Sequence, residues 1–130
     1  MLFDIDRFVS FEGDTGPYLL YSYARAESIV RKVGKKKSKS QVSSLGEQER
    51  RLLNELAKFP EVVSQAAQQY APSLIAQYAY LLAQTFNEFY HSSTVIGSDD
   101  EAFRVNLVQA FAQTLKNALT LLGIAPLKEM

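Results

Sequence analysis

The sequence predicts an all-α protein, a helical bundle of about five to six helices. Three observations support this fold class. Apolar residues recur at i, i+3 and i+4 over several segments, which is the period of an amphipathic helix. No stretch alternates apolar and polar residues as a half-buried strand would. Glycine and proline fall between the periodic segments, where helices usually end.

A short helix is expected over residues 4–10, followed by a turn at 12–16. Pro17 then opens a second helix, because its missing N–H costs nothing at the first helical position. We expect this helix to run to about Val33 and to end at Gly34, the usual left-handed residue after a helix.

Residues 34–46 form a Lys/Ser-rich stretch without periodicity, which predicts a mobile loop. A helix is expected over 47–59, where leucines lie on one stripe and Pro60 follows. The next helix is expected over 61–70, and it ends before Pro72.

The longest apolar stripe covers residues 74–89 and predicts a helix of at least four turns. After a loop at 92–97, Ser98 and Glu101 have the spacing of a capping box. The final helix, over 99–122, is apolar on most sides. We therefore expect it to be the central and most buried helix of the bundle.

The bulk composition is that of a single globular domain spanning residues 1–130, with 47% hydrophobic and 22% charged residues. The absence of cysteine excludes disulfides, thiolate metal sites and cysteine nucleophiles. No apolar run is long enough to span a membrane, and the N-terminus lacks the pattern of a secretion signal. These features favour a cytoplasmic protein, which we expect to be a monomer.

Positive charge is concentrated in one segment, although the net charge of the chain is zero. Residues 25–39 contain seven Lys or Arg residues and a single Glu. This segment could attract a polyanion locally.

Catalytic patterns are missing. The single histidine, His91, has no nucleophile or carboxylate at a supporting spacing, and acidic residues cluster at helix starts, where they complement the helix dipole. No dinucleotide fingerprint or phosphate loop is present. We expect neither a catalytic residue nor a metal site in this chain.

The segment "GPYLLYSYAR" places three side chains together on a helical wheel. Tyr18, Tyr21 and Arg25 share a face that is separate from the apolar stripe of the same helix. This spacing leaves two interpretations open. A neighbouring helix could cover the rings while Arg25 pairs with a carboxylate, or the face could stack unpaired bases while Arg25 contacts phosphate or base edges. The adjacent basic segment favours the second interpretation.

The longer stretch "SFEGDTGPYLLYSYAR" resembles the block that opens the C-terminal anticodon-binding (DALR) domain of arginyl-tRNA synthetases. "ERRLLNELAKFPEVVSQAAQQYAPSLIAQYAYLLAQTFNEFYH" resembles its central helices, and "LKNALTLLGIAPLKEM" its C-terminal end. The resemblance implies the all-α bundle of a class I synthetase anticodon-binding domain, and recognition of the anticodon loop of arginine tRNA. The residues that it places at the tRNA are Tyr18, Tyr21, Arg25, Tyr90 and Met130. Lys32, in the basic segment, is expected to add a phosphate contact.

Two positions depart from the family pattern, since Leu20 replaces a customary glutamine and Tyr23 a customary histidine. These changes remove one polar contact and add an aromatic ring. No catalytic domain is present, so the chain alone is not expected to activate arginine. ATP and magnesium would act in the catalytic domain of a parent ligase, and no cofactor is expected in this domain.

The chain is therefore expected to be a domain cut from a longer ligase or a stand-alone relative. A free-standing tRNA-binding adaptor is one alternative function. Another is an all-α protein-interaction module, whose aromatic face would hold a partner helix.

Overall fold

The computed structural model describes the backbone of residues 5–33, 45–93, 95, 97 and 100–124, and the side chains of that set from residue 16 onward. Five α-helices make up most of these residues, which confirms the predicted all-α fold. The helices are α1 (Ile5–Val33), α2 (Glu47–Ala57), α3 (Phe59–Gln69), α4 (Ser73–Ser92) and α5 (Glu101–Leu121).

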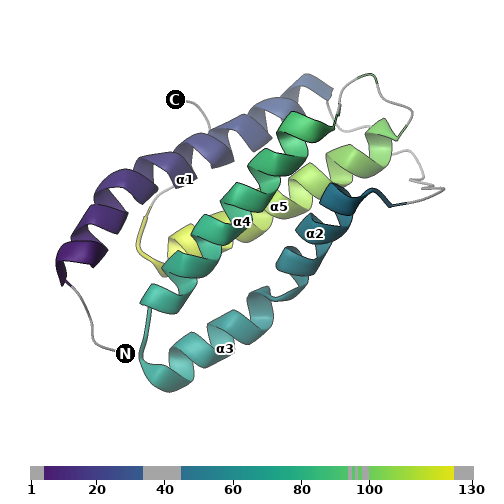
Figure 1. The fold of residues 1–130 in the computed structure, drawn as a ribbon. Helices are drawn as coiled ribbons and strands as arrows, with labels where there is room; N and C mark the ends of the chain where they lie inside the picture. The colour runs from purple at the N-terminus through teal and green to yellow at the C-terminus, as the bar shows by residue number, and fades with distance from the viewer. Residues whose placement is uncertain (1–4, 34–44, 94, 96, 98–99, 125–130) are drawn as a thin grey trace.

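Helices α1, α4 and α5 lie side by side along the long axis of the molecule (Figure 1). Helices α2 and α3 follow one another on the other side of α4. As a result, α4 packs against all four other helices, whereas α5 packs mainly against α1, α4 and α2. The expectation that the last helix is the most central one is therefore wrong. The two helices nevertheless contribute equally to the core, since α4 and α5 each bury eight residues.

The core lies where α1, α4 and α5 meet, and it is built from aromatic and aliphatic side chains. The rings of Phe86 and Phe111 stack face to face, with centroids 4.0 Å apart and an interplanar angle of 3°. Burial of such rings is the main force that holds helices together. The predicted stripes supply this core, whose largest fully buried apolar side chains are Phe86, Phe89, Phe111, Leu52, Leu82, Leu115, Leu119 and Val108.

Helix α1 differs most from the expectation, because the predicted turn at residues 12–16 is helical and Pro17 lies inside the helix. Proline removes a single backbone hydrogen bond, the one its N–H would have made to the carbonyl of Gly13. Residues on both sides still supply their own helical bonds. The separate helices expected over 4–10 and from Pro17 are thus one helix of 29 residues.

The other predicted boundaries agree with the structure to within a few residues. Pro60 lies in the first turn of α3, and Tyr70 ends that helix in the left-handed conformation, with φ 51°. Helix α5 begins after Asp100, so the N-cap expected at Ser98 is wrong. Glu101 nevertheless reaches back, since its Oε1 accepts a hydrogen bond from the N–H of Gly97 at 3.2 Å.

Candidate nucleic-acid interface

Arg25 of α1 lies between two exposed tyrosine rings. Its guanidinium carbon is 4.7 Å from the ring centroid of Tyr21, one turn earlier on α1, and 4.4 Å from that of Tyr90 on α4. Arg25 Nη2 also donates a hydrogen bond to the Tyr21 hydroxyl at 2.9 Å. The planar cation therefore stacks with both rings, and they hold it in place.

Asn87 of α4 connects this group to the rest of α1. Its Oδ1 accepts a hydrogen bond from Arg25 Nη1 at 2.8 Å. Its Nδ2 donates to the Tyr18 hydroxyl at 2.7 Å and to Ser22 Oγ at 3.2 Å. One amide thus links three residues of α1 to α4. We call the group of Tyr18, Tyr21, Arg25, Asn87 and Tyr90 the α1–α4 cluster.

The rings of the α1–α4 cluster differ in how much they are covered. Tyr18 packs against Tyr80 of α4, with ring centroids 5.5 Å apart, and is half-buried. Tyr21 is 51% exposed and Tyr90 is 38% exposed. Two aromatic side chains that contact one cation are therefore partly exposed to solvent.

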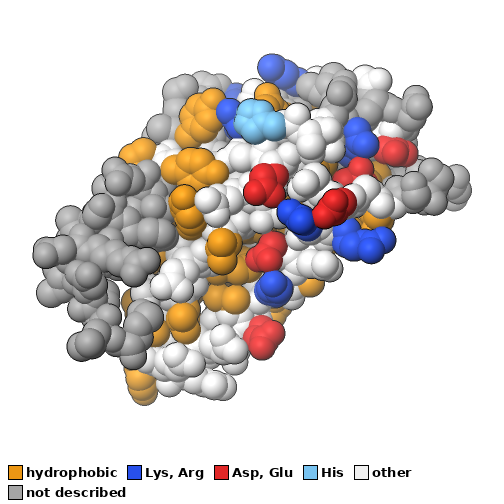
Figure 2. All heavy atoms as spheres, in the orientation of Figure 1, with side chains coloured by type: hydrophobic (Ala, Val, Ile, Leu, Met, Phe, Trp, Pro, Cys, Tyr) orange, Lys and Arg blue, Asp and Glu red, His pale blue; other side chains and the backbone are white. Residues whose placement is uncertain are grey.

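No carboxylate among the described side chains pairs with Arg25. Its hydrogen-bond partners are an amide oxygen and a phenol, and none of the ion pairs between described side chains includes it. Figure 2 shows a band of hydrophobic side chains over α1 and α4, whereas acidic and basic side chains alternate over α2 and α3. The α1–α4 cluster therefore combines exposed rings with a net positive charge.

Four of the six site residues predicted from the sequence come together here: Tyr18, Tyr21, Arg25 and Tyr90. Lys32 is exposed in the last turn of α1. It lies seven residues beyond Arg25, on the same side of the helix and about 10 Å along it. Met130 and residues 34–44 of the predicted loop lie outside the described residues.

The first interpretation left open by the sequence is only partly correct. Helix α4 does cover Tyr18, but it leaves half of Tyr21 exposed, and Arg25 has a neutral amide as its partner on α4. The structure adds Asn87 and Tyr80, which sequence reasoning missed. Tyr80, Asn87 and Tyr90 share one face of α4, but this spacing does not indicate which residues of α1 they contact.

Tyr23 does not join the aromatic group, although it replaces the family's customary histidine. It is buried on the opposite face of α1, as the helical wheel indicated. Burial raises the pKa of its hydroxyl, and the negative charge of Glu27 raises it further. The Tyr23 side chain is therefore a neutral part of the core near neutral pH.

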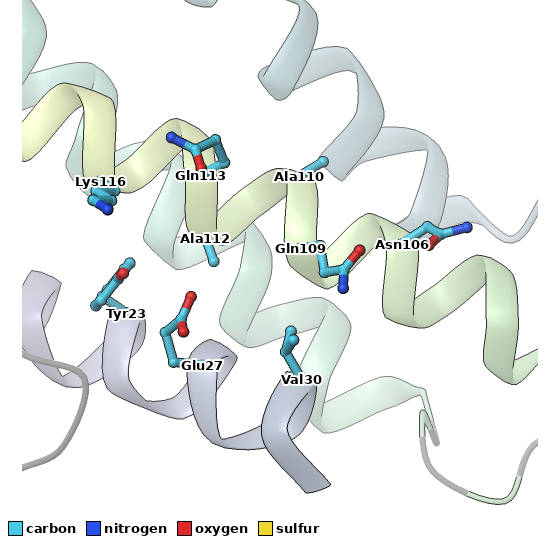
Figure 3. A pocket seen from close by; sticks show the side chains of 9 residues that line it. All are labelled: Tyr23, Glu27, Val30, Asn106, Gln109, Ala110, Ala112, Gln113 and Lys116. Carbon is cyan, nitrogen blue, oxygen red and sulfur yellow. The ribbon is translucent and has the colours of Figure 1, made fainter. Parts of the chain in front are cut away.

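A hollow of about 510 Å³ lies between α1 and α5, away from the α1–α4 cluster (Figure 3). Tyr23, Glu27 and Val30 line it from α1, and amide side chains such as Gln109 and Gln113 line it from α5. Glu27 and Lys116 both line it, so the hollow carries one charge of each sign, whereas the described side chains of the α1–α4 cluster include a cation and no carboxylate. An anionic ligand is therefore favoured at the α1–α4 cluster over this hollow.

Among the described residues, no group of three acidic or histidine side chains is placed to hold a metal ion. In that same part of the chain, no helix combines the length and the apolar character needed to span a membrane.

Comparison with known proteins relates the chain to one family. Residues 19–130 match the family described as the DALR anticodon binding domain. Over 130 residues the chain is 45% identical to the arginine–tRNA ligase of Ligilactobacillus salivarius, which covers 98% of this chain and 23% of the relative. Over 127 residues it is 39% identical to the arginine–tRNA ligase of Flavobacterium psychrophilum, covering 95% of this chain and 21% of the relative.

Two solved structures share the fold. Arginyl-tRNA synthetase of Thermus thermophilus matches with a TM-score of 0.85 and 37% identity, over 92% of this chain and 22% of that one. A putative arginyl-tRNA synthetase of Campylobacter jejuni matches with a TM-score of 0.79 and 31% identity, over 87% and 26%. The chain thus spans about a quarter of the length of the proteins it matches. It belongs to the DALR anticodon-binding domain family.

Proposed function

We propose that this chain is the anticodon-loop recognition module of an arginine–tRNA ligase. The observation that carries the proposal is the placement of Arg25 between the exposed rings of Tyr21 and Tyr90, where no described carboxylate pairs with it. The relatives support it, because they are arginine–tRNA ligases.

The α1–α4 cluster suits an unpaired RNA loop for two physical reasons. Bases that have left the helical stack can pack on tyrosine rings, and each such contact contributes about 1–3 kcal/mol. Arg25 and Lys32 supply positive charge for the phosphates between those bases, on the same side of α1. Met130 stays a predicted contact.

In this proposal the chain binds and does not catalyse. Activation of arginine with ATP and magnesium would take place in the catalytic domain of the parent ligase, which is the second partner of this chain besides arginine tRNA. A monomeric ligase in the cytoplasm is the setting that we infer for it.

A fluorescence anisotropy titration with an arginine-tRNA anticodon stem-loop tests the proposal. A second stem-loop with a changed anticodon serves as the control, and both are titrated at two salt concentrations. We expect tighter binding to the arginine stem-loop and a fall in affinity with salt. Equal binding to both stem-loops, or binding that ignores salt, would contradict the proposal.

Lys32 provides a matched test of the phosphate contact. Lys32→Gln should make the slope of log affinity against log salt shallower by about 0.7, the value for one phosphate of a single strand. Lys116, which is exposed on α5 and lines the hollow between α1 and α5, is the control. Lys116→Gln should leave the slope unchanged, and an equal change in both variants would remove Lys32 from the site.

A further inference from the structure

The orientation of the Asn87 amide is fixed by its neighbours. Arginine has no hydrogen-bond acceptor, so the atom of Asn87 that lies 2.8 Å from Arg25 Nη1 must be the oxygen. The amide nitrogen then faces α1, where it donates to the Tyr18 hydroxyl and to Ser22 Oγ. Exchanging the two atoms would bring two donors together at Arg25.

This orientation determines what the tyrosine hydroxyls can do. The Tyr18 oxygen accepts a hydrogen from Asn87, and the Tyr21 oxygen accepts one from Arg25. A tyrosine hydroxyl has one hydrogen of its own to donate. Neither hydroxyl donates to another described side chain, so both hydrogens are available to a ligand.

We propose that Asn87 is a positioning residue that makes three members of the α1–α4 cluster, Tyr18, Tyr21 and Arg25, a surface of hydrogen-bond donors. Arg25 can only donate, and the Tyr18 and Tyr21 hydroxyls donate because their oxygens already accept bonds from Asn87 and Arg25. Such a surface selects acceptor atoms of a nucleotide, which are base carbonyl and ring nitrogen atoms or phosphate oxygens. The inference rests on the proposed function and specifies the chemistry that its site recognises.

The substitution Asn87→Asp tests whether residue 87 sets the direction of the Tyr18 hydroxyl hydrogen, and it leaves all the rings in place. A carboxylate at position 87 still accepts from Arg25, but it also accepts from the Tyr18 hydroxyl, which must then turn its hydrogen inward. Tyr18→Phe is made in both backgrounds, and affinity for the arginine stem-loop is measured. With Asn87 present, loss of the hydroxyl should weaken binding about fivefold, as expected for one hydrogen bond. With Asp at 87, the same loss should change affinity less than twofold.

Tyr21→Phe is the matched control, because the Tyr21 oxygen bonds to Arg25 and not to residue 87. Its cost should be the same in both backgrounds. If Tyr18→Phe also costs the same in both, Asn87 does not control the Tyr18 hydroxyl and the inference is overturned.

The changed-anticodon stem-loop identifies the RNA atom that accepts the hydrogen bond from Tyr18. Loss of discrimination in Tyr18→Phe indicates a base atom, and equal weakening for both stem-loops indicates a phosphate oxygen.

The network can also be measured without RNA. Both side-chain amide protons of Asn87 should exchange slowly with solvent by NMR, and Tyr18→Phe should expose one of them. Rapid exchange of both protons in the wild type would overturn the assigned orientation. If the protons are protected but the wild type binds no stem-loop, the proposed function fails while the orientation of the amide stands.

Discussion

The polar side chains on the two sides of α4 differ in how their charges are paired. Towards α2 and α5, an ion pair joins Glu49 to Arg104 at 3.2 Å, and the two side chains are only 4% and 19% exposed. Towards α1, the α1–α4 cluster places Arg25 against an amide and two exposed rings. One arginine therefore has its charge compensated in the interior, and the other keeps an uncompensated charge at the surface.

The difference separates what holds the bundle together from what is available to a ligand. The Glu49–Arg104 pair bridges α2 and α5, so breaking it leaves a charge in a poorly solvated place. The contacts of Arg25 are neutral, and solvent or a ligand can replace them at small cost. Substitutions on the α2 side should therefore change stability, and substitutions in the α1–α4 cluster should change binding.

The largest expected effect is on the α2 side. Glu49→Ala should lower the free energy of unfolding by about 3 kcal/mol, because Arg104 then keeps its charge without Glu49. The corresponding fall in melting temperature is about 10 °C, measurable by circular dichroism. Binding of the stem-loop, measured well below the melting temperature, should be unchanged.

The exposed ion pair between Glu47 and Arg51 is the control, since both side chains are more than half exposed. Glu47→Ala should cost less than about 1 kcal/mol. Equal destabilisation by Glu47→Ala and Glu49→Ala would show that burial does not distinguish the two pairs.

A smaller effect, on binding and not on stability, is expected in the α1–α4 cluster. Tyr21→Ala should weaken stem-loop binding by about 1–3 kcal/mol, the value of one lost stacking contact, with little change in melting temperature. Tyr70 is the control, because it is 93% exposed and lies at the end of α3. Its left-handed backbone tolerates asparagine, so Tyr70→Asn should change neither quantity. Unaltered affinity in Tyr21→Ala would show that no base stacks on Tyr21.

The smallest effect concerns Tyr78, whose buried hydroxyl donates a hydrogen bond to the backbone carbonyl of Glu55 in α2. Burial, and then the charge of Glu55, raises the pKa of Tyr78 above its ordinary value of 10.0. The stabilising contribution is therefore complete below pH 10 and is lost as the pH rises from 10 towards the higher folded-state pKa. Tyr78→Phe should cost about 1 kcal/mol at pH 8.

Urea unfolding at pH 8 and pH 11 measures this pH dependence. The wild type should lose more stability than Tyr78→Phe between the two pH values. Equal losses would place the alkaline sensitivity elsewhere, for example at Tyr23, whose pKa is also raised.

Much of the fold could be predicted because the helices are amphipathic. The stripe over residues 74–89 predicted the buried face of α4, and the structure buries most of it, although Leu81 is 53% exposed. Of the leucines after Glu47, Leu52 is buried, and Leu53 and Leu56 are partly buried. Proline and glycine were weaker guides. Pro60 does lie at a helix start, but Pro17 lies within α1, since the loss of one backbone bond does not end a helix that continues on both sides.

The site could be predicted only on one helix at a time. Spacing alone placed Tyr18, Tyr21 and Arg25 on one face of α1, and the family resemblance added Tyr90. Asn87 could not be assigned, because its partners depend on how α4 is rotated and offset against α1. That arrangement comes from the packing of the whole core, and no local pattern in the sequence encodes it.

The stacked pair of Phe86 and Phe111 has a consequence for how this domain changes by mutation. Phe86 directly precedes Asn87, and its ring also lies 6.3 Å from that of Tyr90. A substitution at Phe111 on α5 would shift Phe86, and with it the part of α4 that carries the amide and the second ring. Under the proposed function, selection for a new anticodon preference should therefore recover variants at Phe111, which is fully buried.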